Sequence, residues 1–332
     1  MQTLILYTGG TIGMQPSANG LVPAGGFDAL LRAEQAQRPD AHRFRWRFQE
    51  LSPPIDSANI DQAHWLVMRD AIVTAVEQEQ CDGVLVLHGT DTMAYSTAAL
   101  SFLLLGLPVP VVFTGAMLPA AAPDSDAWDN LFGALRHLAE GVPPGVHLFF
   151  HNRLLPGTRV TKRSSEQFDA FAETRRPVAP PQPNLLASEP PDFRVQRQSV
   201  NMACLPLYPG LRAEHVQGLL ESGLQALLLE CYGSGTAPAD NTALMEALSR
   251  AHTQGVVLAA ISQCPEGQVH LGTYAAGSRL AECGVISGGG MTREAALGKL
   301  FALLGTRLAP EAVEILFQCD LCGELTGAAF SH

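Results

Sequence analysis

The feature that most constrains this chain is the stretch from Val84 to Met93, VLVLHGTDTM. Its first four residues are all apolar, which is typical of a strand buried on both faces of a parallel sheet. The polar residues His88 to Thr92 then fall at the carboxyl end of that strand, where open α/β sheets bind their ligands. Residues 94–105 are expected to form the helix that returns across the sheet. The stretch therefore predicts an α/β fold with hydroxyls and a carboxylate at the mouth of a crevice.

A second stretch near the N-terminus has the same form. Residues 3–7 predict a buried strand, and TGGTIG follows at residues 8–13. Two strand ends that each deliver a threonine after a glycine suggest one shared site, because such ends meet at one edge of a parallel sheet. Residues 14–26 are rich in glycine and proline and predict a loop, whereas a dinucleotide-binding fingerprint requires an immediate helix. Nucleotide binding is disfavoured further because residues 1–30 contain no lysine.

Apolar runs and helical patterns alternate along the rest of the chain, which predicts further strand–helix units. Strands are expected at residues 44–48, 110–114, 146–150, 224–229 and 256–261, and helices at residues 27–37, 61–80, 131–138, 240–253 and 293–304. Six prolines within residues 174–191 predict a semi-extended linker. We therefore expect a larger N-terminal α/β domain with a mostly parallel sheet flanked by helices, residues 1–190, and a smaller C-terminal α/β domain, residues 191–332.

Charge and cysteine content narrow the possible partners. The formal net charge of −11 argues against nucleic acid and anionic membranes, which both require a basic surface. No apolar run reaches the roughly 18 residues of a membrane span, and the first residues lack the features of a signal peptide, so a cytoplasmic protein is expected. Seven scattered cysteines agree with reduced thiols. Cys319 and Cys322 have metal or redox spacing, but no second pair lies nearby, and no metal site is expected.

The polar residues at the strand ends form a set suited to acyl transfer from an amide or an ester. Thr11 and Thr90 offer hydroxyls, which are poor nucleophiles until a base takes their proton. A lysine serves as such a base only when burial or a neighbouring charge lowers its pKa. Lys162 is the candidate base, and Asp91 would orient it and balance its charge. Without this set, the HGTDT sequence alone would fit purely structural roles in a turn and a helix cap equally well.

These motifs resemble those of the bacterial-type L-asparaginase family, and within it the cytoplasmic type I enzymes. The likeness covers nearly the whole chain, and the first two motifs together are highly specific. The matching blocks are TGGTIG at residues 8–13, HGTDTM at 88–93, TGAM at 114–117, Ser125-Asp126, TKRSS at 161–165, CYGSGTAP at 231–238 and GVISGGGMT at 284–292.

The resemblance implies hydrolysis of the side-chain amide of L-asparagine to L-aspartate and ammonia through a threonine acyl-enzyme, with no metal or organic cofactor. It implies that Thr11 is the nucleophile and that Thr90, Asp91 and Lys162 form a triad-like catalytic cluster. The substrate-binding residues that it implies are Asp56, Ser57, Gly89, Ala116 and Thr236. It also implies a homodimer or homotetramer in which the C-terminal half of one copy completes the site of a neighbour.

Two positions depart from the family pattern. Type I members carry a tyrosine in the loop after the first motif, where this chain has Leu21, and many relatives place asparagine where this chain has Thr236. Because both positions could gate substrate length, a broader glutaminase-asparaginase is an alternative. A weakly active or non-catalytic homologue that binds an amino acid is another, although a pure sensor would not need all four catalytic candidates.

Overall fold

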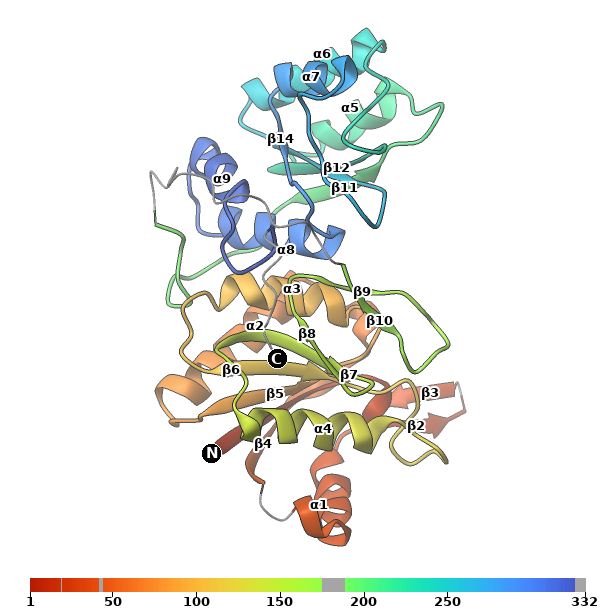
Figure 1. Cartoon of the computed structure of the whole chain (residues 1–332), viewed down its shortest axis with the longest axis vertical. Helices are drawn as coiled ribbons and strands as arrows, with labels where there is room; N and C mark the ends of the chain where they lie inside the picture. The colour runs from red at the N-terminus through yellow and green to blue at the C-terminus, as the bar shows by residue number, and fades with distance from the viewer. Residues whose placement is uncertain (19, 42–43, 175–188, 326–332) are drawn as a thin grey trace. The chain divides into compact units, whose positions relative to one another are not determined.

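The computed structural model of the protein describes residues 1–332 except residues 19, 42–43, 175–188 and 326–332. The chain divides into two compact units, Met1–Glu173 and Thr174–His332. Each unit is built from a largely parallel sheet and helices, which confirms the predicted fold class (Figure 1). Most of the predicted linker, residues 174–191, lies outside the described residues, and the boundary near residue 190 stays a prediction.

The first unit contains a six-stranded sheet in the order β4-β1-β5-β6-β7-β8. Its strands are β1 (Gln2–Gly9), β4 (Arg45–Ile55), β5 (Gly83–Leu87), β6 (Pro110–Thr114), β7 (Gly145–Phe150) and β8 (Arg153–Pro156). The first five run parallel, and only β8 is antiparallel to its neighbour. Both β5 and β6 are buried along their whole length, as their unbroken apolar runs predicted.

Helices cover both faces of this sheet (Figure 1). One face carries α1 (Phe27–Gln37) and α4 (Ala127–Glu140), and the other carries α2 (Gln62–Glu77) and α3 (Met93–Leu103). The connections β5–α3–β6 and β6–α4–β7 advance in the same direction along the sheet, yet their helices lie on opposite faces. The two crossovers therefore have opposite hands, and one of them is the rare left-handed form.

The N-terminal glycine- and proline-rich segment is not the loop that its composition predicted. It forms an antiparallel hairpin of β2 (Met14–Ser17) and β3 (Gly20–Pro23), which follows the short 3₁₀ helix η1 (Thr11–Gly13). Turn-forming residues fit a tight hairpin as well as they fit a loop, and composition alone does not distinguish the two.

Strand β4 is also longer than the predicted residues 44–48, because it continues through Pro53 and Pro54 to Ile55. Proline is tolerated there since β4 lies at the edge of the sheet, where one row of backbone groups has no partner strand. The next turn, η3 (Ser57–Asn59), leads into α2, which begins after the N-cap Asp61. Another short 3₁₀ helix, η2 (Pro39–Ala41), precedes β4.

The second unit contains a four-stranded parallel sheet in the order β11-β12-β13-β14. Its strands are β11 (Met202–Pro206), β12 (Ala226–Cys231), β13 (Val257–Ser262) and β14 (Val285–Ser287), and its helices are α5 (Ala213–Glu221), α6 (Thr242–Thr253), α7 (Ala275–Glu282), α8 (Arg293–Leu304) and α9 (Pro310–Phe317). The predicted N-cap Thr292 accepts a hydrogen bond of 3.1 Å from the Ala295 N–H, which confirms the predicted start of α8.

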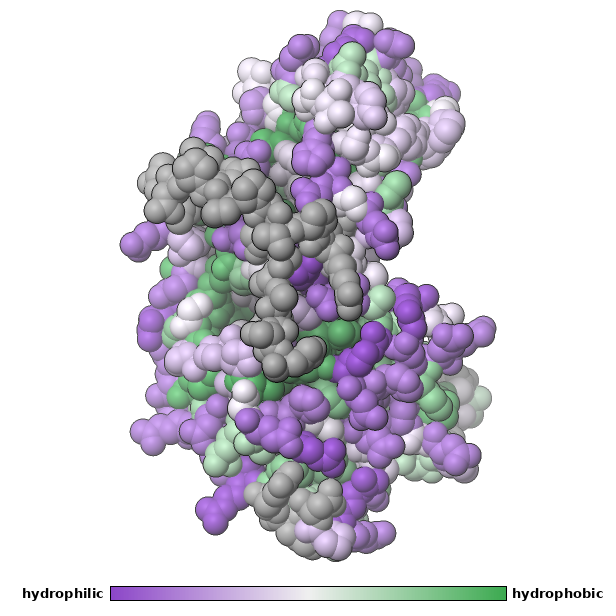
Figure 2. Space-filling view, in the orientation of Figure 1, coloured by the Kyte–Doolittle hydropathy of each residue, from purple (hydrophilic) through white to green (hydrophobic). Residues whose placement is uncertain are grey.

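Polar and charged side chains cover much of the molecular face seen in Figure 2. No helix in the part of the chain that the structure describes is both long and apolar enough to cross a membrane.

Candidate active site

Apart from Lys162, the predicted site residues of the first unit follow the carboxyl ends of four adjacent strands. Thr11 follows β1, Asp56 and Ser57 follow β4, residues 89–91 follow β5, and Ala116 follows β6. The chain leaves β1 towards β4 on one side and later returns on the other side as β5. The β1–β5 boundary is therefore the topological switch point, where open α/β sheets bind ligands.

Two glycines allow the turns after these strands to touch. A Cβ atom at Gly10 would overlap the backbone of Gly89, and one at Gly89 would lie 2.5 Å from Ser57 Oγ. Gly10 also has a φ of 83°, a conformation in which a residue with a side chain is strained. Its N–H donates to the Ile55 carbonyl at 3.2 Å and so ties the turn to the end of β4. The glycines in the two motifs are therefore required by close backbone approach between the turns after β1, β4 and β5.

The candidate catalytic cluster after β5 is held by hydrogen bonds to Lys162. Its Nζ donates to Thr90 Oγ1 at 2.9 Å and to Asp91 Oδ1 at 2.6 Å. Thr90 is buried and the Lys162 side chain is only 17% exposed, whereas the Asp91 side chain is 68% exposed. An amine in direct contact with a hydroxyl can accept its proton once the amine is neutral. The structure thus brings Lys162 to two adjacent residues that lie more than seventy positions before it in the chain.

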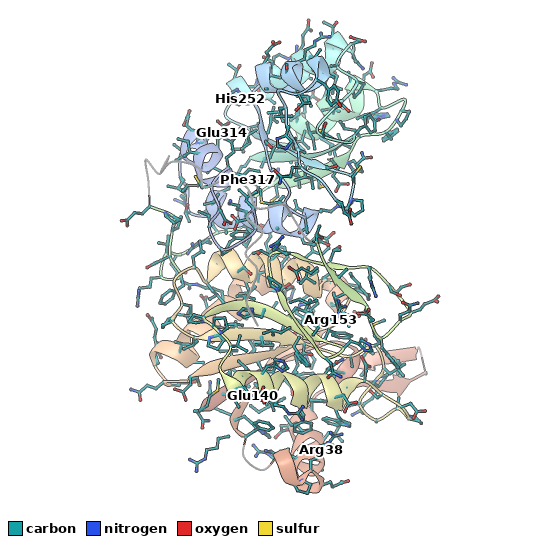
Figure 3. All side chains as sticks on the ribbon, in the orientation of Figure 1. Arg38, Glu140, Arg153, His252, Glu314 and Phe317 are labelled. Carbon is teal, nitrogen blue, oxygen red and sulfur yellow. The ribbon has the colours of Figure 1, made fainter. Side chains whose placement is uncertain are left out.

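Lys162 is fixed by a small sheet that the sequence pattern did not predict. It ends β9 (Val160–Lys162), which pairs with β10 (Phe171–Glu173) and places Lys162 opposite Phe171. Arg153, labelled in Figure 3, donates to the Phe171 carbonyl at 2.6 Å and also binds Asp169. Asp169 binds Arg163 as well. These contacts limit the movement of the lysine, and such supporting groups are what hold a catalytic side chain in position.

Thr11 lies in a turn that a buried tyrosine supports. Tyr7 Oη donates to the Ala24 carbonyl at 3.0 Å, beyond the far end of the β2–β3 hairpin. A Cβ atom at Gly13, just before the hairpin, would overlap the same Tyr7 hydroxyl. Burial raises the pKa of the Tyr7 phenol, which therefore stays a hydrogen-bond donor. One side chain thus contacts both ends of the hairpin, and Leu21 on that hairpin is 49% exposed.

The predicted substrate-binding residues have varied local roles. Asp56 is the N-cap of η3 and accepts a hydrogen bond of 3.2 Å from the Ala58 N–H. Ser57 is buried, and Ala116 is 1% exposed after β6. Thr236 belongs to the second unit, where its Oγ1 donates to the Tyr232 carbonyl at 3.3 Å. Its grouping with the residues of the first unit stays a prediction.

Metal ligands are absent from this region of the described chain. Among the residues that the structure describes, no cluster of three His, Cys, Asp or Glu side chains could hold an ion. Cys319 and Cys322 carry free thiols. His147 is buried, its Nε2 contacts the Pro143 carbonyl at 3.0 Å, and burial lowers its pKa.

Comparisons with known proteins show the family to which the chain belongs. Residues 2–182 match the family model "Asparaginase, N-terminal", and residues 201–317 match the "Glutaminase/Asparaginase C-terminal domain". The chain is 38% identical to L-asparaginase 1 of Escherichia coli strain K12 over 97% of both chains, and 33% identical to the L-asparaginase of Thermococcus kodakarensis over 99% of this chain and 100% of the relative. The solved structure of L-asparaginase I from Vibrio cholerae matches with a TM-score of 0.85 at 36% identity, and the match covers 98% of this chain and 99% of that one. The predicted resemblance is thus confirmed, and the chain belongs to the asparaginase family of enzymes.

Proposed function

We propose that this enzyme hydrolyses the side-chain amide of L-asparagine to L-aspartate and ammonia. The observation that carries the proposal is the contact of Lys162 Nζ with both Thr90 Oγ1 and Asp91 Oδ1 at the switch point of the sheet. Such a lysine can activate a hydroxyl or a water molecule without any metal. The names of the E. coli and T. kodakarensis relatives agree with asparagine as the substrate.

The reaction proceeds in two steps. Thr11 Oγ1 attacks the amide carbon and loses its proton to a base, and the tetrahedral intermediate expels ammonia once the amide nitrogen has been protonated. This leaves an ester between the threonine and the substrate acyl group. Water, activated by the Thr90–Lys162 pair with Asp91 balancing the charge, then attacks the ester and releases aspartate. Backbone N–H groups of the glycine-rich turns stabilise the oxyanion in both steps.

Substrate recognition is assigned to the turns around this cluster. Asp56 and Ser57 bind the amino and carboxylate groups of the amino acid, with Gly89 and Ala116 lining the pocket. Thr236 comes from the second unit of a neighbouring copy, so the active form is a homodimer or homotetramer. We also propose that the enzyme is cytoplasmic, that its partner is a small molecule and that it binds neither nucleic acid nor membrane, in keeping with its net charge of −11.

Ammonia release from L-asparagine, L-glutamine and D-asparagine by the purified protein tests the proposal. L-asparagine should give the highest kcat/KM. Thr11→Ala should lower kcat at least about 10³-fold while aspartate still binds, because the lost interaction is made in the transition state. Thr242→Ala, which removes an exposed hydroxyl at the start of α6, is the matched control and should keep full activity.

Three results would point elsewhere. Substantial activity of Thr11→Ala would refute the assignment of the nucleophile. A higher kcat/KM for L-glutamine would favour the broader glutaminase-asparaginase. Binding of asparagine without ammonia release, even at high protein concentration, would favour a non-catalytic amino-acid sensor.

A further inference from the structure

Three buried polar side chains form a continuous chain of contacts that ends next to Thr90. Trp65 on α2 donates its indole N–H to Ser96 Oγ on α3 at 2.9 Å. Ser96 Oγ lies 2.9 Å from His88 Nε2, and His88 Nδ1 lies 2.7 Å from the Gly89 carbonyl oxygen. All three side chains are at most 8% exposed. None of them has a role in the reaction proposed above, so their arrangement needs its own explanation.

Only one set of proton positions satisfies every contact in this chain. An indole nitrogen can only donate, so Ser96 Oγ accepts from Trp65 and keeps its own hydrogen to donate onwards. Burial lowers the pKa of His88 to about 4, so the imidazole is neutral and carries one proton. If that proton were on Nε2, the Nδ1 lone pair would face the Gly89 carbonyl oxygen. The proton therefore lies on Nδ1, Nε2 accepts from Ser96, and all the hydrogen bonds point from Trp65 towards Gly89.

The acceptor at the end of this chain belongs to the peptide that leads into the catalytic cluster. The Gly89 carbonyl and the Thr90 N–H are opposite sides of one planar unit, so a hydrogen bond to the oxygen fixes the direction of both. Within the described part of the chain the Thr90 N–H makes no hydrogen bond, which leaves it available to a bound ligand. The Thr90 side chain, which meets Lys162, starts from the same peptide.

We propose that His88, oriented by Ser96 and Trp65, is a positioning residue that holds the Gly89–Thr90 peptide in the orientation that the reaction requires. A glycine can rotate its backbone more freely than other residues, so a hydrogen bond from another side chain is needed to fix the peptide after Gly89. The His88 backbone is itself anchored, because its N–H donates to the Thr114 carbonyl at 2.9 Å. This inference rests on the proposed roles of Thr90 and Lys162.

The test compares Ser96→Ala with Ser96→Thr and with a control that loses an indole hydrogen bond elsewhere in the first unit. Trp46→Phe is that control, because the Trp46 indole donates to Gln35 Oε1 at 2.9 Å and so links β4 to α1. Ser96→Ala should lower kcat for asparagine about tenfold, the value of one hydrogen bond, with KM changed less than twofold. Ser96→Thr retains the hydroxyl and should restore kcat, and Trp46→Phe should leave kcat within twofold of wild type.

A second measurement does not depend on activity. Nitrogen-15 NMR of the wild-type imidazoles should show His88 with its proton on Nδ1 and a bare Nε2 at neutral pH. A proton on Nε2 would overturn the hydrogen-bond chain even if the enzyme hydrolyses asparagine. Asparagine hydrolysis with an unchanged kcat in Ser96→Ala would overturn the positioning role and leave the proposed function intact. The predicted tautomer in a protein that releases no ammonia would instead refute the proposed function, and the positioning role with it.

Discussion

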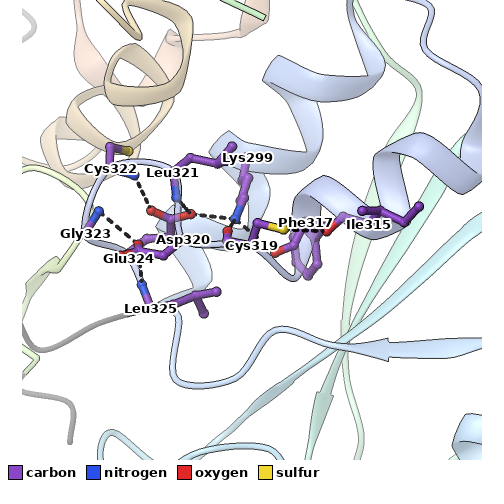
Figure 4. A network of polar contacts seen from close by, with 10 residues as sticks. All are labelled: Lys299, Ile315, Phe317, Cys319, Asp320, Leu321, Cys322, Gly323, Glu324 and Leu325. Atoms are coloured by element: carbon purple, nitrogen blue, oxygen red, sulfur yellow. Dashed lines mark hydrogen bonds and ion pairs between the residues drawn. The ribbon is translucent and has the colours of Figure 1, made fainter. Parts of the chain in front are cut away.

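Lys299 on α8 is fully buried, and replacing it should destabilise the second unit strongly. Its Nζ contacts a carboxylate oxygen of Glu324, which is also fully buried, and two backbone carbonyls at the end of α9 (Figure 4). Those carbonyls belong to Phe317 and Cys319. Glu324 in turn accepts the N–H groups of residues 321 and 322 at 2.9 and 2.8 Å. One ammonium group therefore joins α8 to the end of α9 and to the loop of residues 319–325.

The magnitude follows from what Lys299→Met leaves behind. Methionine keeps most of the side-chain volume but removes all the donors, so the Glu324 carboxylate stays buried without its counter-charge. Removing one partner of a buried ion pair typically costs about 3–5 kcal/mol of unfolding free energy. In the double variant Lys299→Met/Glu324→Gln, no charge is left unpaired, and an amide oxygen can still accept the two N–H groups. We expect its loss to be at most half that of Lys299→Met, so the two substitutions are strongly non-additive.

Urea unfolding followed by far-ultraviolet circular dichroism measures these free energies. Tryptophan fluorescence reports unfolding of the first unit separately, because Trp46, Trp65 and Trp128 all lie in that unit and Lys299 lies in the other. Arg212→Met is the matched control, since it breaks only the exposed ion pair with Glu214 and should leave the free energy of unfolding nearly unchanged. A loss for Lys299→Met no larger than for Arg212→Met would refute the reasoning.

Three further predictions concern the first unit. Lys162→Met should lower kcat about 10²–10⁴-fold, which is the typical contribution of a positioned proton-transfer group. Steady-state ammonia release measures this effect, with Arg163→Met as the control, and an equal loss in both variants would contradict the assignment of Lys162. We expect wild-type kcat to be modest because residue 21 lacks a phenolic hydroxyl, and Leu21→Tyr should raise kcat by as much as about 10²-fold. An unchanged or lower kcat for Leu21→Tyr would contradict this expectation. Burial lowers the pKa of His88 from 6.5 to about 4 in the folded state. Between pH 6.5 and pH 4, His88 is therefore protonated in the unfolded chain but neutral in the folded chain. Unfolding free energy should therefore fall by about 3 kcal/mol as the pH drops from 6.5 to 4, and His88→Asn should show a shallower dependence in chemical unfolding at each pH.

Much of the secondary structure of both units could be predicted because its signals are local. The four apolar residues before His88 indicated a strand buried on both faces, and β5 lies where they placed it. Thr292 predicted the start of α8 through a hydrogen bond that spans only three residues. The candidate cluster could also be named, because Thr90 and Asp91 directly follow a predicted strand. Lys162 was included as the candidate base, and the resemblance to a known family then assigned it to the same cluster.

Other features were beyond local patterns. The glycines and prolines of residues 14–23 were compatible with a loop or a hairpin, and only strand pairing decided for the hairpin. The predicted strand stopped at residue 48, yet Pro53 and Pro54 lie in β4 because that strand is at an edge, a property of the whole sheet. Composition carries no information about which neighbour a segment will have, so these choices were made by tertiary structure.

What the sequence by itself determined is therefore the alternation of strands and helices and the polar residues at the strand ends, since both follow from short periodic patterns and turn chemistry. Tertiary structure alone decided the buried polar contacts, both those behind the catalytic cluster and the one inside the second unit. The contacts of Asp169 with Arg153, of Ser96 with His88, and of Glu324 with Lys299 join residues between 8 and 25 positions apart on different elements. Each such pair forms only once two elements have packed and excluded water, and burial is what makes its hydrogen bonds costly to lose.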